Sequence, residues 1–261
     1  MLTDVFDYLV YYIIVLCVGS FAAAYTVRWP IKSRYLWEKE AHHILALPFK
    51  QAAPTLITTK RSHCVHCHHP LPWYDLIPIV SFVWLKGKCR SCQHPVSFRY
   101  PIIESLHVIC CLPLPWLTDS LYELLLHTCI ISALIVAATI DLEHKLIPDE
   151  CNGLILFASL LLSLSSNHLE SSVMGLLIGF SLIYFLRKGY LIVRQSEGIG
   201  LGDAKLLAAL GAWLGVAHLP LLLLGASVSG ILYTVLSNKN RQDYMAFGPF
   251  LIFSAMCVFY L

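Results

Sequence analysis

Residues 121–150 read LYELLLHTCIISALIVAATIDLEHKLIPDE, an apolar run that ends in a cluster of charges. Residues 121–140 are long enough to cross a bilayer as a helix, which takes about 20 predominantly apolar residues. Asp141 stands where this run ends. An acid inside or beside a membrane helix is energetically costly, so its presence there indicates a function. The stretch therefore predicts a membrane helix with a functional carboxylate at its end.

The composition of the whole chain also indicates a membrane protein. Of its 261 residues, 57% are hydrophobic and only 13% are charged, and the mean hydropathy is +0.69. Soluble domains carry about 25% charged residues, so this chain is too apolar to be one. The apolar runs predict an all-α polytopic membrane protein with about eight transmembrane helices. These spans are expected near residues 8–26, 101–118, 121–140, 151–166, 172–186, 204–216, 217–236 and 247–261.

The distribution of charge predicts the orientation of these spans. Only acids, Asp4 and Asp7, precede the first span, and basic residues follow it directly. Cytoplasmic loops carry an excess of Lys and Arg, so we expect the N-terminus outside and residues 27–100 in the cytoplasm. Alternating the spans from there places all 18 Lys and Arg residues on the cytoplasmic side. It also places Asp141 and Asp203 at the cytoplasmic membrane border.

The expected organisation has three parts. Residues 1–33 form a first transmembrane segment, residues 34–100 a cytoplasmic loop that contains a cysteine module at 61–100, and residues 101–261 a membrane-embedded domain. The net charge of +2 reflects the basic loops, and no basic stripe with interleaved aromatic residues occurs. The lipid bilayer is thus an expected partner and nucleic acid is not. The oligomeric state is not predicted.

Four cysteines in the loop have the spacing of a zinc site. Cys64 and Cys67 lie in HCVHCHHP, Cys89 and Cys92 lie in KCRSCQHP, and 21 residues separate the two pairs. Each C-x2-C turn directs two thiolates at one metal, and two such turns complete a tetrahedral shell with bonds of about 2.3 Å. Because four thiolates leave no open position for a catalytic water, we expect a structural zinc ion that folds a zinc-ribbon-like module.

Other interpretations of these cysteines remain open. Two disulfides are conceivable, although the cytoplasm is reducing, and a thioredoxin-like redox role lacks the surrounding βαβ pattern. A nearby histidine is also able to replace a thiolate as a ligand. The candidate histidines are His63, His66, His68, His69 and His94.

A second acid completes a candidate catalytic pair. Asp203 lies in EGIGLGDAKLLAALGAWLG, residues 197–215, and is the other carboxylate at the end of an apolar run. If Asp141 and Asp203 meet, they cannot both ionise easily, so the pair holds one proton near neutral pH. That is the state in which an aspartyl protease activates water and protonates its leaving group. Gly200 and Gly202 lack side chains and would let a substrate backbone approach.

A structural role for each aspartate is the competing interpretation. An Asp at the end of a span often caps a helix or pairs with a nearby lysine, here Lys145 or Lys205. Neither H-E-x-x-H nor G-x-S-x-G occurs, so metalloprotease and serine hydrolase motifs are missing. The remaining acids near the two motifs are interpreted as solvated loop charges, with Asp149 also a possible helix cap. These acids are Glu143, Asp149, Glu150 and Glu197.

Together these stretches resemble the bacterial type IV prepilin peptidases, which are bifunctional leader peptidases and N-methyltransferases of the inner membrane. Residues 62–104 are similar to that family's cytoplasmic zinc region, IDLEHKLIPD (140–149) to its first aspartate motif, and residues 197–215 to its G-x-G-D motif. The resemblance covers most of the chain from residue 62 onward, together with Gly19-Ser20-Phe21 in the first span.

The resemblance implies an aspartyl endopeptidase with Asp141 and Asp203 as its catalytic residues. It implies cleavage of the leader from type IV prepilins and type II secretion pseudopilins, after Gly and before Phe. It also implies methylation of the new N-terminus with S-adenosylmethionine, at a site that is not predicted. One departure from the family is visible, because Ala22-Ala23-Ala24-Tyr25 stands where the family usually has Leu-Asn-Val-Val.

Two other classes of function compete with this interpretation. One is a catalytically silent membrane scaffold whose zinc module binds partners. The other is a transporter that uses intramembrane carboxylates as a proton relay. A relay favours acids near the bilayer midplane, whereas Asp141 and Asp203 are expected at the membrane border.

Overall fold

The computed structural model describes residues 5–54, 61–195, 198, 200–237 and 245–261, so Asp4 and Glu197 lie outside the described residues. Within these ranges the chain is helical, and its only β-structure is two isolated bridges in the cysteine module. The chain divides into two compact units, Leu2–Pro115 and Trp116–Leu261. The predicted division at residues 33 and 100 is not tested by this boundary and stays a prediction.

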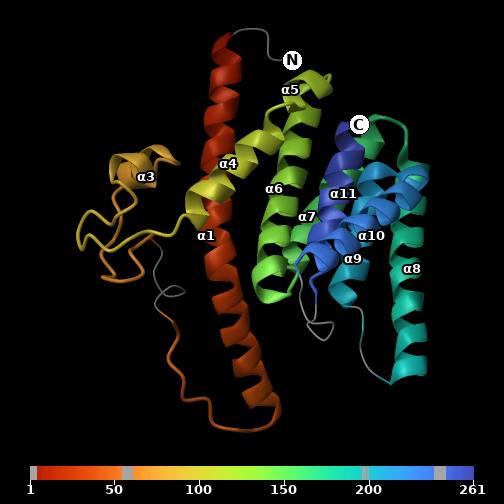
Figure 1. Cartoon of the computed structure of the whole chain (residues 1–261), viewed down its shortest axis with the longest axis horizontal. Helices are drawn as coiled ribbons and strands as arrows, with labels where there is room; N and C mark the ends of the chain where they lie inside the picture. Colours follow the sequence, from red (N-terminus) through yellow and green to blue (C-terminus); the bar gives the residue numbers. More distant parts are fainter. Residues whose placement is uncertain (1–4, 55–60, 196–197, 199, 238–244) are drawn as a thin grey trace. The chain divides into compact units, whose positions relative to one another are not determined.

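The first unit is built on one long helix, α1 (Val5–Ile44), which packs against α4 (Arg99–Cys111) (Figure 1). Between them in sequence lie η1 (Trp73–Leu76) and α3 (Val80–Trp84), both within the cysteine module. Gly19 lets α1 and α4 approach closely, since a Cβ at this position would lie 3.2 Å from the Cβ of His107. The hydroxyl groups of Tyr11 and Tyr12 also donate to carbonyls at the end of α4 and just after it.

The second unit is a bundle of helices. After the short α5 (Leu114–Leu117), which crosses the boundary between the units, come α6 (Leu121–His144), α7 (Asp149–Ser165) and α8 (Leu169–Arg194). They are followed by α9 (Leu201–Leu214), η2 (Val216–His218), α10 (Leu219–Leu236) and α11 (Gly248–Tyr260). Helix α6 begins at Ser120, whose hydroxyl accepts the Glu123 amide as an N-cap.

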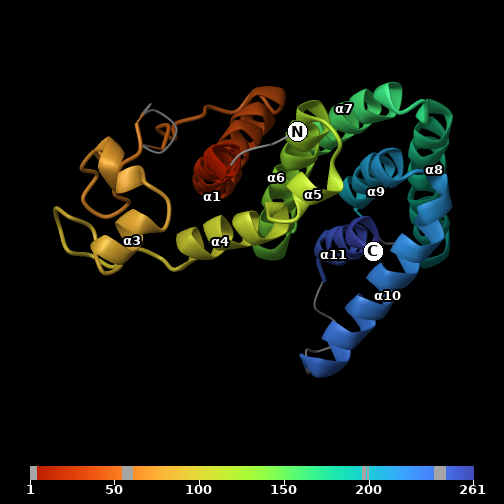
Figure 2. The same ribbon diagram turned by 90° about the horizontal axis from the view of Figure 1, so that it is seen from above.

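Helix α9 lies inside this bundle and contacts α7, α8 and α11 (Figure 2). Its residues from Leu206 to Ala212 are all buried. Helix α8 approaches it without intervening side chains, because a methyl group on Gly175 would overlap the carbonyl of Gly211, and one on Gly179 would lie 2.7 Å from the Leu207 carbonyl oxygen. Small residues allow this backbone-to-backbone packing in membrane helices. The packing fixes the position of α9, and therefore of the acid in its first turn.

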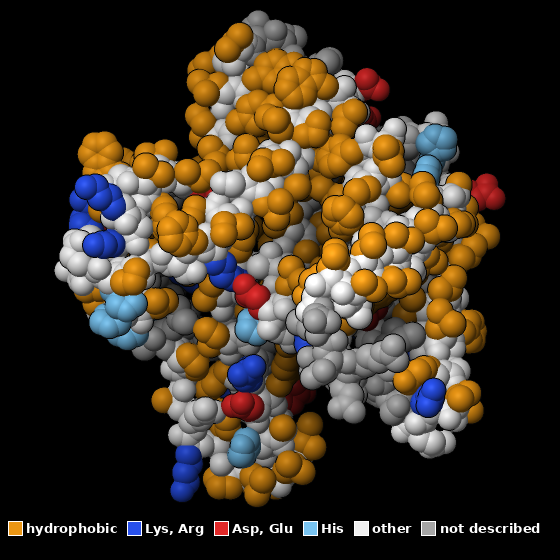
Figure 3. Space-filling model, viewed as in Figure 1, with side chains coloured by type: hydrophobic (Ala, Val, Ile, Leu, Met, Phe, Trp, Pro, Cys, Tyr) orange, Lys and Arg blue, Asp and Glu red, His pale blue; other side chains and the backbone are white. Residues whose placement is uncertain are grey.

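Within the described residues, five helical segments are long and apolar enough to cross a membrane: Val5–Ile44, Arg99–Leu117, Leu121–His144, Leu169–Arg194 and Val216–Leu236. Apolar side chains cover much of the surface, as expected for helices that face lipid (Figure 3). The predicted all-α membrane fold is confirmed, but the count of eight spans is not. At 1.5 Å per residue, α9 is only about 21 Å long, shorter than the bilayer core of about 30 Å.

Candidate active site and metal cluster

Asp141 occupies the last turn of α6, at the point where the helix must end. Lys145 ends the helix in the left-handed conformation with φ of 57°, and its amide donates to the carbonyl of Asp141 at 2.9 Å. Pro148 has the extended conformation and starts α7 at the next residue. Asp141 is only 4% exposed. The backbone amide of Gly248 lies close enough to stabilise its carboxylate, but no donor among the described residues makes a well-aligned hydrogen bond to its Oδ2 atom. A buried carboxylate oxygen without a partner is unusual unless it serves chemistry.

Asp203 lies in the first turn of α9, three residues after the N-cap Gly200. Its carboxylate accepts a hydrogen bond from the backbone amide of Gly200, as the acid of a capping box does. Gly200 is the N-cap, so Asp203 is not itself the cap residue, but its carboxylate reaches back to the amide of that cap. A Cβ on Gly200 would lie 3.2 Å from Oδ2 of Asp203, and one on Gly202 would lie 3.4 Å from the Cβ of Ile147. The predicted role of both glycines in substrate access stays a prediction.

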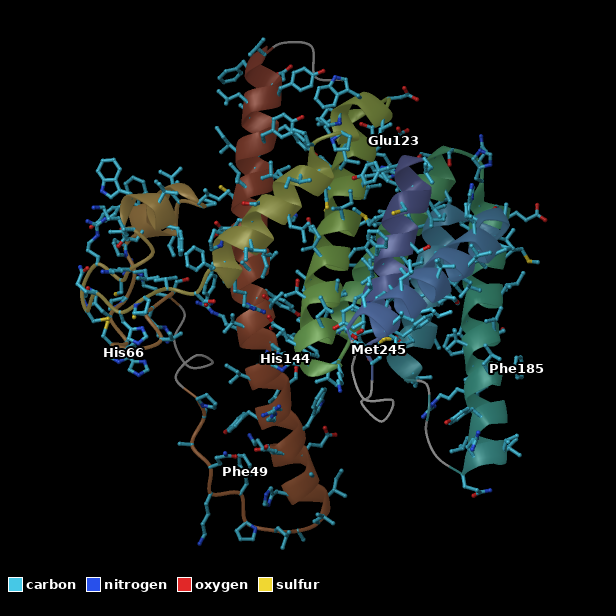
Figure 4. The ribbon with its side chains drawn as sticks, in the orientation of Figure 1. Phe49, His66, Glu123, His144, Phe185 and Met245 are labelled. Carbon is cyan, nitrogen blue, oxygen red and sulfur yellow. The ribbon has the colours of Figure 1, made fainter. Side chains whose placement is uncertain are left out.

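The fold brings the two acids to the same end of the second unit. Asp203 lies close enough to Asp141 for its charge to act on that carboxylate. Ile147, in the connection from α6 to α7, contacts the positions of both Gly202 and Gly248 and so joins the starts of α9 and α11. Figure 4 marks this end of the unit with His144, in the last turn of α6, and Met245, just before α11.

A third element, the start of α11, completes the surroundings of Asp141. A Cβ on Gly248 would lie 2.5 Å from Oδ2 of Asp141 and 3.0 Å from Cδ1 of Ile147, so this position admits no side chain without a rearrangement. Gly248 is not among the site residues predicted from the sequence. The signal was present in Phe247-Gly248-Pro249, a glycine and a proline at the start of an apolar helix, but nothing in the sequence says that this helix packs on α6.

An ion pair between described residues at this end of the unit uses neither candidate acid. Lys205 Nζ donates to both carboxylate oxygens of Asp149 at 2.7 and 2.8 Å and so ties the start of α9 to the start of α7. The predicted alternative, in which Lys205 neutralises Asp141 or Asp203, is not what the structure has. Asp149 and Glu150 lie in the first turn of α7, where a negative charge is favourable.

The four loop cysteines come together as a cluster in the first unit. Their sulfur atoms all lie within 4.8 Å of one another, and Cys64 Sγ is 3.9 Å from Cys92 Sγ. The two C-x2-C turns have matching geometry. The amides of Cys64 and Cys89 donate to the carbonyls of His69 and His94, and an isolated antiparallel bridge closes each turn. Each of the two turns therefore contributes two of the four sulfur atoms of the cluster.

The cluster fits a tetrahedral metal ion. Four thiolates at about 2.3 Å from a metal are about 3.8 Å apart, close to the 3.9 Å between Cys64 Sγ and Cys92 Sγ. The backbone amide near His94 lowers the pKa of Cys92, but partial desolvation and hydrogen bonding with the other three thiols outweigh it and raise the pKa to about 12. Thiols this close cannot all ionise alone, and a divalent cation removes that difficulty. The four cysteines would therefore hold the metal, which would supply a structural crosslink rather than a reaction centre.

The structure distinguishes between the alternative roles predicted for the module's cysteines and histidines. All four cysteines are free thiols, so the disulfide interpretation has no support. None of the five module histidines belongs to the metal-binding group among the described residues. His66, labelled in Figure 4, instead stacks on His94 with ring centroids 4.2 Å apart.

Two family models match the chain. Residues 13–118 match the Bacterial Peptidase A24 N-terminal domain, and residues 128–235 match the Type IV leader peptidase family. The gap between the two matches, residues 119–127, begins three residues after the boundary between the compact units at Pro115 and Trp116. No solved structure matches the chain.

Curated relatives match over nearly the whole length. A prepilin leader peptidase/N-methyltransferase of Aeromonas hydrophila is 33% identical over 90% of this chain and 84% of its own. A prepilin leader peptidase/N-methyltransferase of Dickeya chrysanthemi is 35% identical over 92% of this chain and 87% of its own. The type 4 prepilin-like proteins leader peptide-processing enzyme of an Escherichia coli O78:H11 strain is 36% identical over 94% of this chain and 91% of its own. These matches confirm the resemblance seen in the sequence, and the chain belongs to the type IV leader peptidase family.

Proposed function

We propose that this chain is an intramembrane aspartyl endopeptidase that removes the leader of type IV prepilins and type II secretion pseudopilins, cutting after Gly and before Phe. The observation that supports the proposal is that α6 and α9, which are far apart in sequence, bring Asp141 and Asp203 to one end of the second unit, near enough for the charge of Asp203 to act on Asp141. The names of the curated relatives supply the substrate class and the second activity, N-methylation.

In the proposed mechanism the two carboxylates share one proton, because two negative charges at this range repel each other. The ionised carboxylate takes a proton from a water molecule, which attacks the carbonyl carbon of the scissile peptide. The protonated carboxylate stabilises the developing oxyanion by hydrogen bonding and then protonates the leaving amine. The Gly200 amide and the start of α11 hold the two carboxylates in place during these steps.

The proposed location follows from the same features. The chain is a membrane protein, and we place it in the bacterial inner membrane with the N-terminus outside. The metal cluster and both aspartates then face the cytoplasm, where the basic leader of a prepilin would be. Acids at one border suit a protease better than a proton relay, which favours acids near the midplane. S-adenosylmethionine would donate the methyl group, and its site is not assigned.

The proposal is tested with the purified protein in lipid and a purified prepilin. The expected result is a product whose mass corresponds to loss of the leader up to the Gly–Phe bond. With S-adenosylmethionine present, the mass should increase by one methyl group at the new N-terminus. An intact prepilin after prolonged incubation would contradict the proposal and favour a silent scaffold protein.

We expect the metal cluster to hold one zinc ion per chain. Replacing Cys64, Cys67, Cys89 or Cys92 by serine leaves an incomplete shell, so metal content and protein level should both fall. Zinc retention should also fall with decreasing pH, because the metal competes with protons for thiols such as Cys92, whose pKa is raised.

Elemental analysis of freshly purified, reduced protein measures the metal content directly. Cys257→Ser is a matched control, because Cys257 is an exposed cysteine in the last helix, far in sequence from the cluster. It should keep full zinc content. Absence of zinc from the reduced wild-type protein would contradict the prediction.

The two activities are expected to separate by mutation. Hydrolysis needs the acid pair, but methyl transfer needs only a deprotonated amine held in line with the sulfonium methyl group. Asp203→Asn should therefore still methylate a pilin that has already been cleaved and carries a free N-terminal Phe. Transfer of label from S-adenosylmethionine measures this activity. Loss of methylation as complete as the loss of cleavage, in a folded variant, would show that the sites are not independent.

A further inference from the structure

We propose that the aromatic segment, residues 73–84 (WYDLIPIVSFVW), lies within the cytoplasmic leaflet of the membrane beside α1 and α4, with its apolar side chains in contact with lipid. This surface is separate from the proposed active site and does not depend on it. It changes the expectation that all of residues 27–100 lie in the aqueous cytoplasm.

The segment presents a continuous set of large apolar side chains that no described residue covers. Trp73, Val83 and Trp84 are 75%, 68% and 79% exposed, and Val80 in the same turn as Val83 is 57% exposed. Both η1 and α3 contribute to this surface and have no buried residues of their own. An exposed apolar patch of this kind marks a protein or membrane contact rather than a surface in water.

A hydrogen bond fixes the depth of the segment. The backbone amide of Ile79 donates to Oε2 of Glu104 at 2.8 Å, and Glu104 is a buried residue of α4. The Cα of Glu104 in turn lies 3.4 Å from the Cβ position of Gly19 in α1. Gly19 is seven residues before the inner end of the first predicted span at residue 26, a distance of about 10 Å along a helix. Ile79 is therefore held beside a part of α1 that is inside the bilayer.

Several backbone amides of the segment have hydrogen-bond partners within the protein. In lipid, each backbone polar group needs a partner within the protein. The amides of Ser81, Val83 and Leu85 donate to backbone carbonyls, and the Glu104 carboxylate takes the amide of Ile79. Ile79 adopts φ of 58°, which is unusual for a β-branched residue.

The charges near the segment are also arranged for a membrane interface. Asp75, whose side chain is 4% exposed, is neutralised by Arg90 at 2.7 Å, and the same guanidinium lies 5.1 Å above the ring of Tyr74. Trp and Tyr are the residues enriched at the level of lipid headgroups. Lys86 and Lys88 follow the segment directly and would face the anionic headgroups of the cytoplasmic leaflet. The occupant of the surface is thus the lipid bilayer to which α1 and α4 already belong.

The test uses the full protein in nanodiscs, with 5-fluorotryptophan in place of its tryptophans and single Trp→Phe variants to assign each ¹⁹F resonance. Paramagnetic broadening is measured with spin-labelled lipid and, separately, with a water-soluble gadolinium chelate. Trp84 should be broadened severalfold more by the labelled lipid than by the chelate. Trp37 is the matched control, because it is 50% exposed on α1 but lies about 16 Å along the helix beyond residue 26. It should show the opposite preference.

Other occupants give different results. Broadening of Trp84 by the chelate to the same extent as Trp37 would place the segment in water and overturn the proposal. Protection of Trp84 from both probes would also overturn it, in favour of contact with a second copy of the chain. If Trp84 is broadened by the labelled lipid in the protein alone and loses this broadening only after a prepilin is added, lipid covers the segment in the absence of substrate. This result would support the proposal.

A pair of variants tests the depth argument. Glu104→Gln keeps an oxygen that accepts the Ile79 amide, so Trp84 should stay in contact with lipid. Glu104→Leu removes the acceptor and should increase broadening of Trp84 by the chelate, while Trp37 stays unchanged. Zinc content reports whether the module remains folded in each variant. Equal behaviour of folded Gln and Leu variants would show that the hydrogen bond does not hold the segment.

Discussion

Replacing Asp141 or Asp203 by asparagine is expected to abolish leader cleavage while the protein remains inserted in the membrane. The substitution keeps the volume of the side chain and removes only the ability to share and transfer a proton. General acid–base catalysis contributes about 10²–10⁴-fold to a rate, so each variant should lose at least about a hundredfold. The rate is measured from conversion of purified prepilin to mature pilin.

Glu143→Gln is the matched control for both variants. Glu143 lies in the same last turn of α6 as Asp141 but is exposed, and the predicted mechanism gives it no role. This variant should cleave at the wild-type rate. Zinc content should be unchanged in all three variants, since the metal cluster belongs to the other unit. Wild-type-like cleavage by either asparagine variant would remove that aspartate from the proposed pair.

The second large effect is expected at Gly248, where alanine should slow cleavage by about a hundredfold. The added Cβ would lie 2.5 Å from Oδ2 of Asp141, so either the carboxylate or the start of α11 must move. A displacement of about 1 Å at a catalytic group is able to reduce the rate by about 10²-fold. The effect should appear mainly in kcat, because Gly248 touches the acid rather than the distant parts of a pilin.

Gly153→Ala provides the comparison for Gly248→Ala. Gly153 lies in α7, and a Cβ there would meet nothing within 4 Å. Alanine at this position should leave cleavage unchanged and slightly favour the helix. If Gly248→Ala cleaves as fast as Gly153→Ala, the start of α11 does not control the position of Asp141.

Much of this account was accessible from local sequence patterns. The C-x2-C turns predicted a four-cysteine cluster because each ligand pair is set by a turn of a few residues. The apolar runs predicted helices because length and hydropathy are local properties. The two aspartate motifs stood out because acids are rare beside apolar runs.

The parts that sequence did not predict depend on packing between distant segments. Gly248 matters only because α11 packs against α6, and no periodicity encodes that contact. The predicted count of eight spans was not confirmed for a similar reason. After Lys205, α9 is apolar on all sides because other helices cover it, and in sequence a short buried helix resembles a membrane span. The depth of the aromatic segment depends on one hydrogen bond between Ile79 and Glu104.

The central claim is that Asp141 and Asp203 face each other at one site. It is tested most directly by replacing both with cysteine and treating the membrane-embedded protein with a short bifunctional thiol reagent. Mass spectrometry of the digested protein then identifies the linked peptides. The account predicts a link between positions 141 and 203, and none when cysteine replaces Leu142, the 62% exposed neighbour, instead of Asp141. No link at 141 and 203, or equal linkage from position 142, would contradict it.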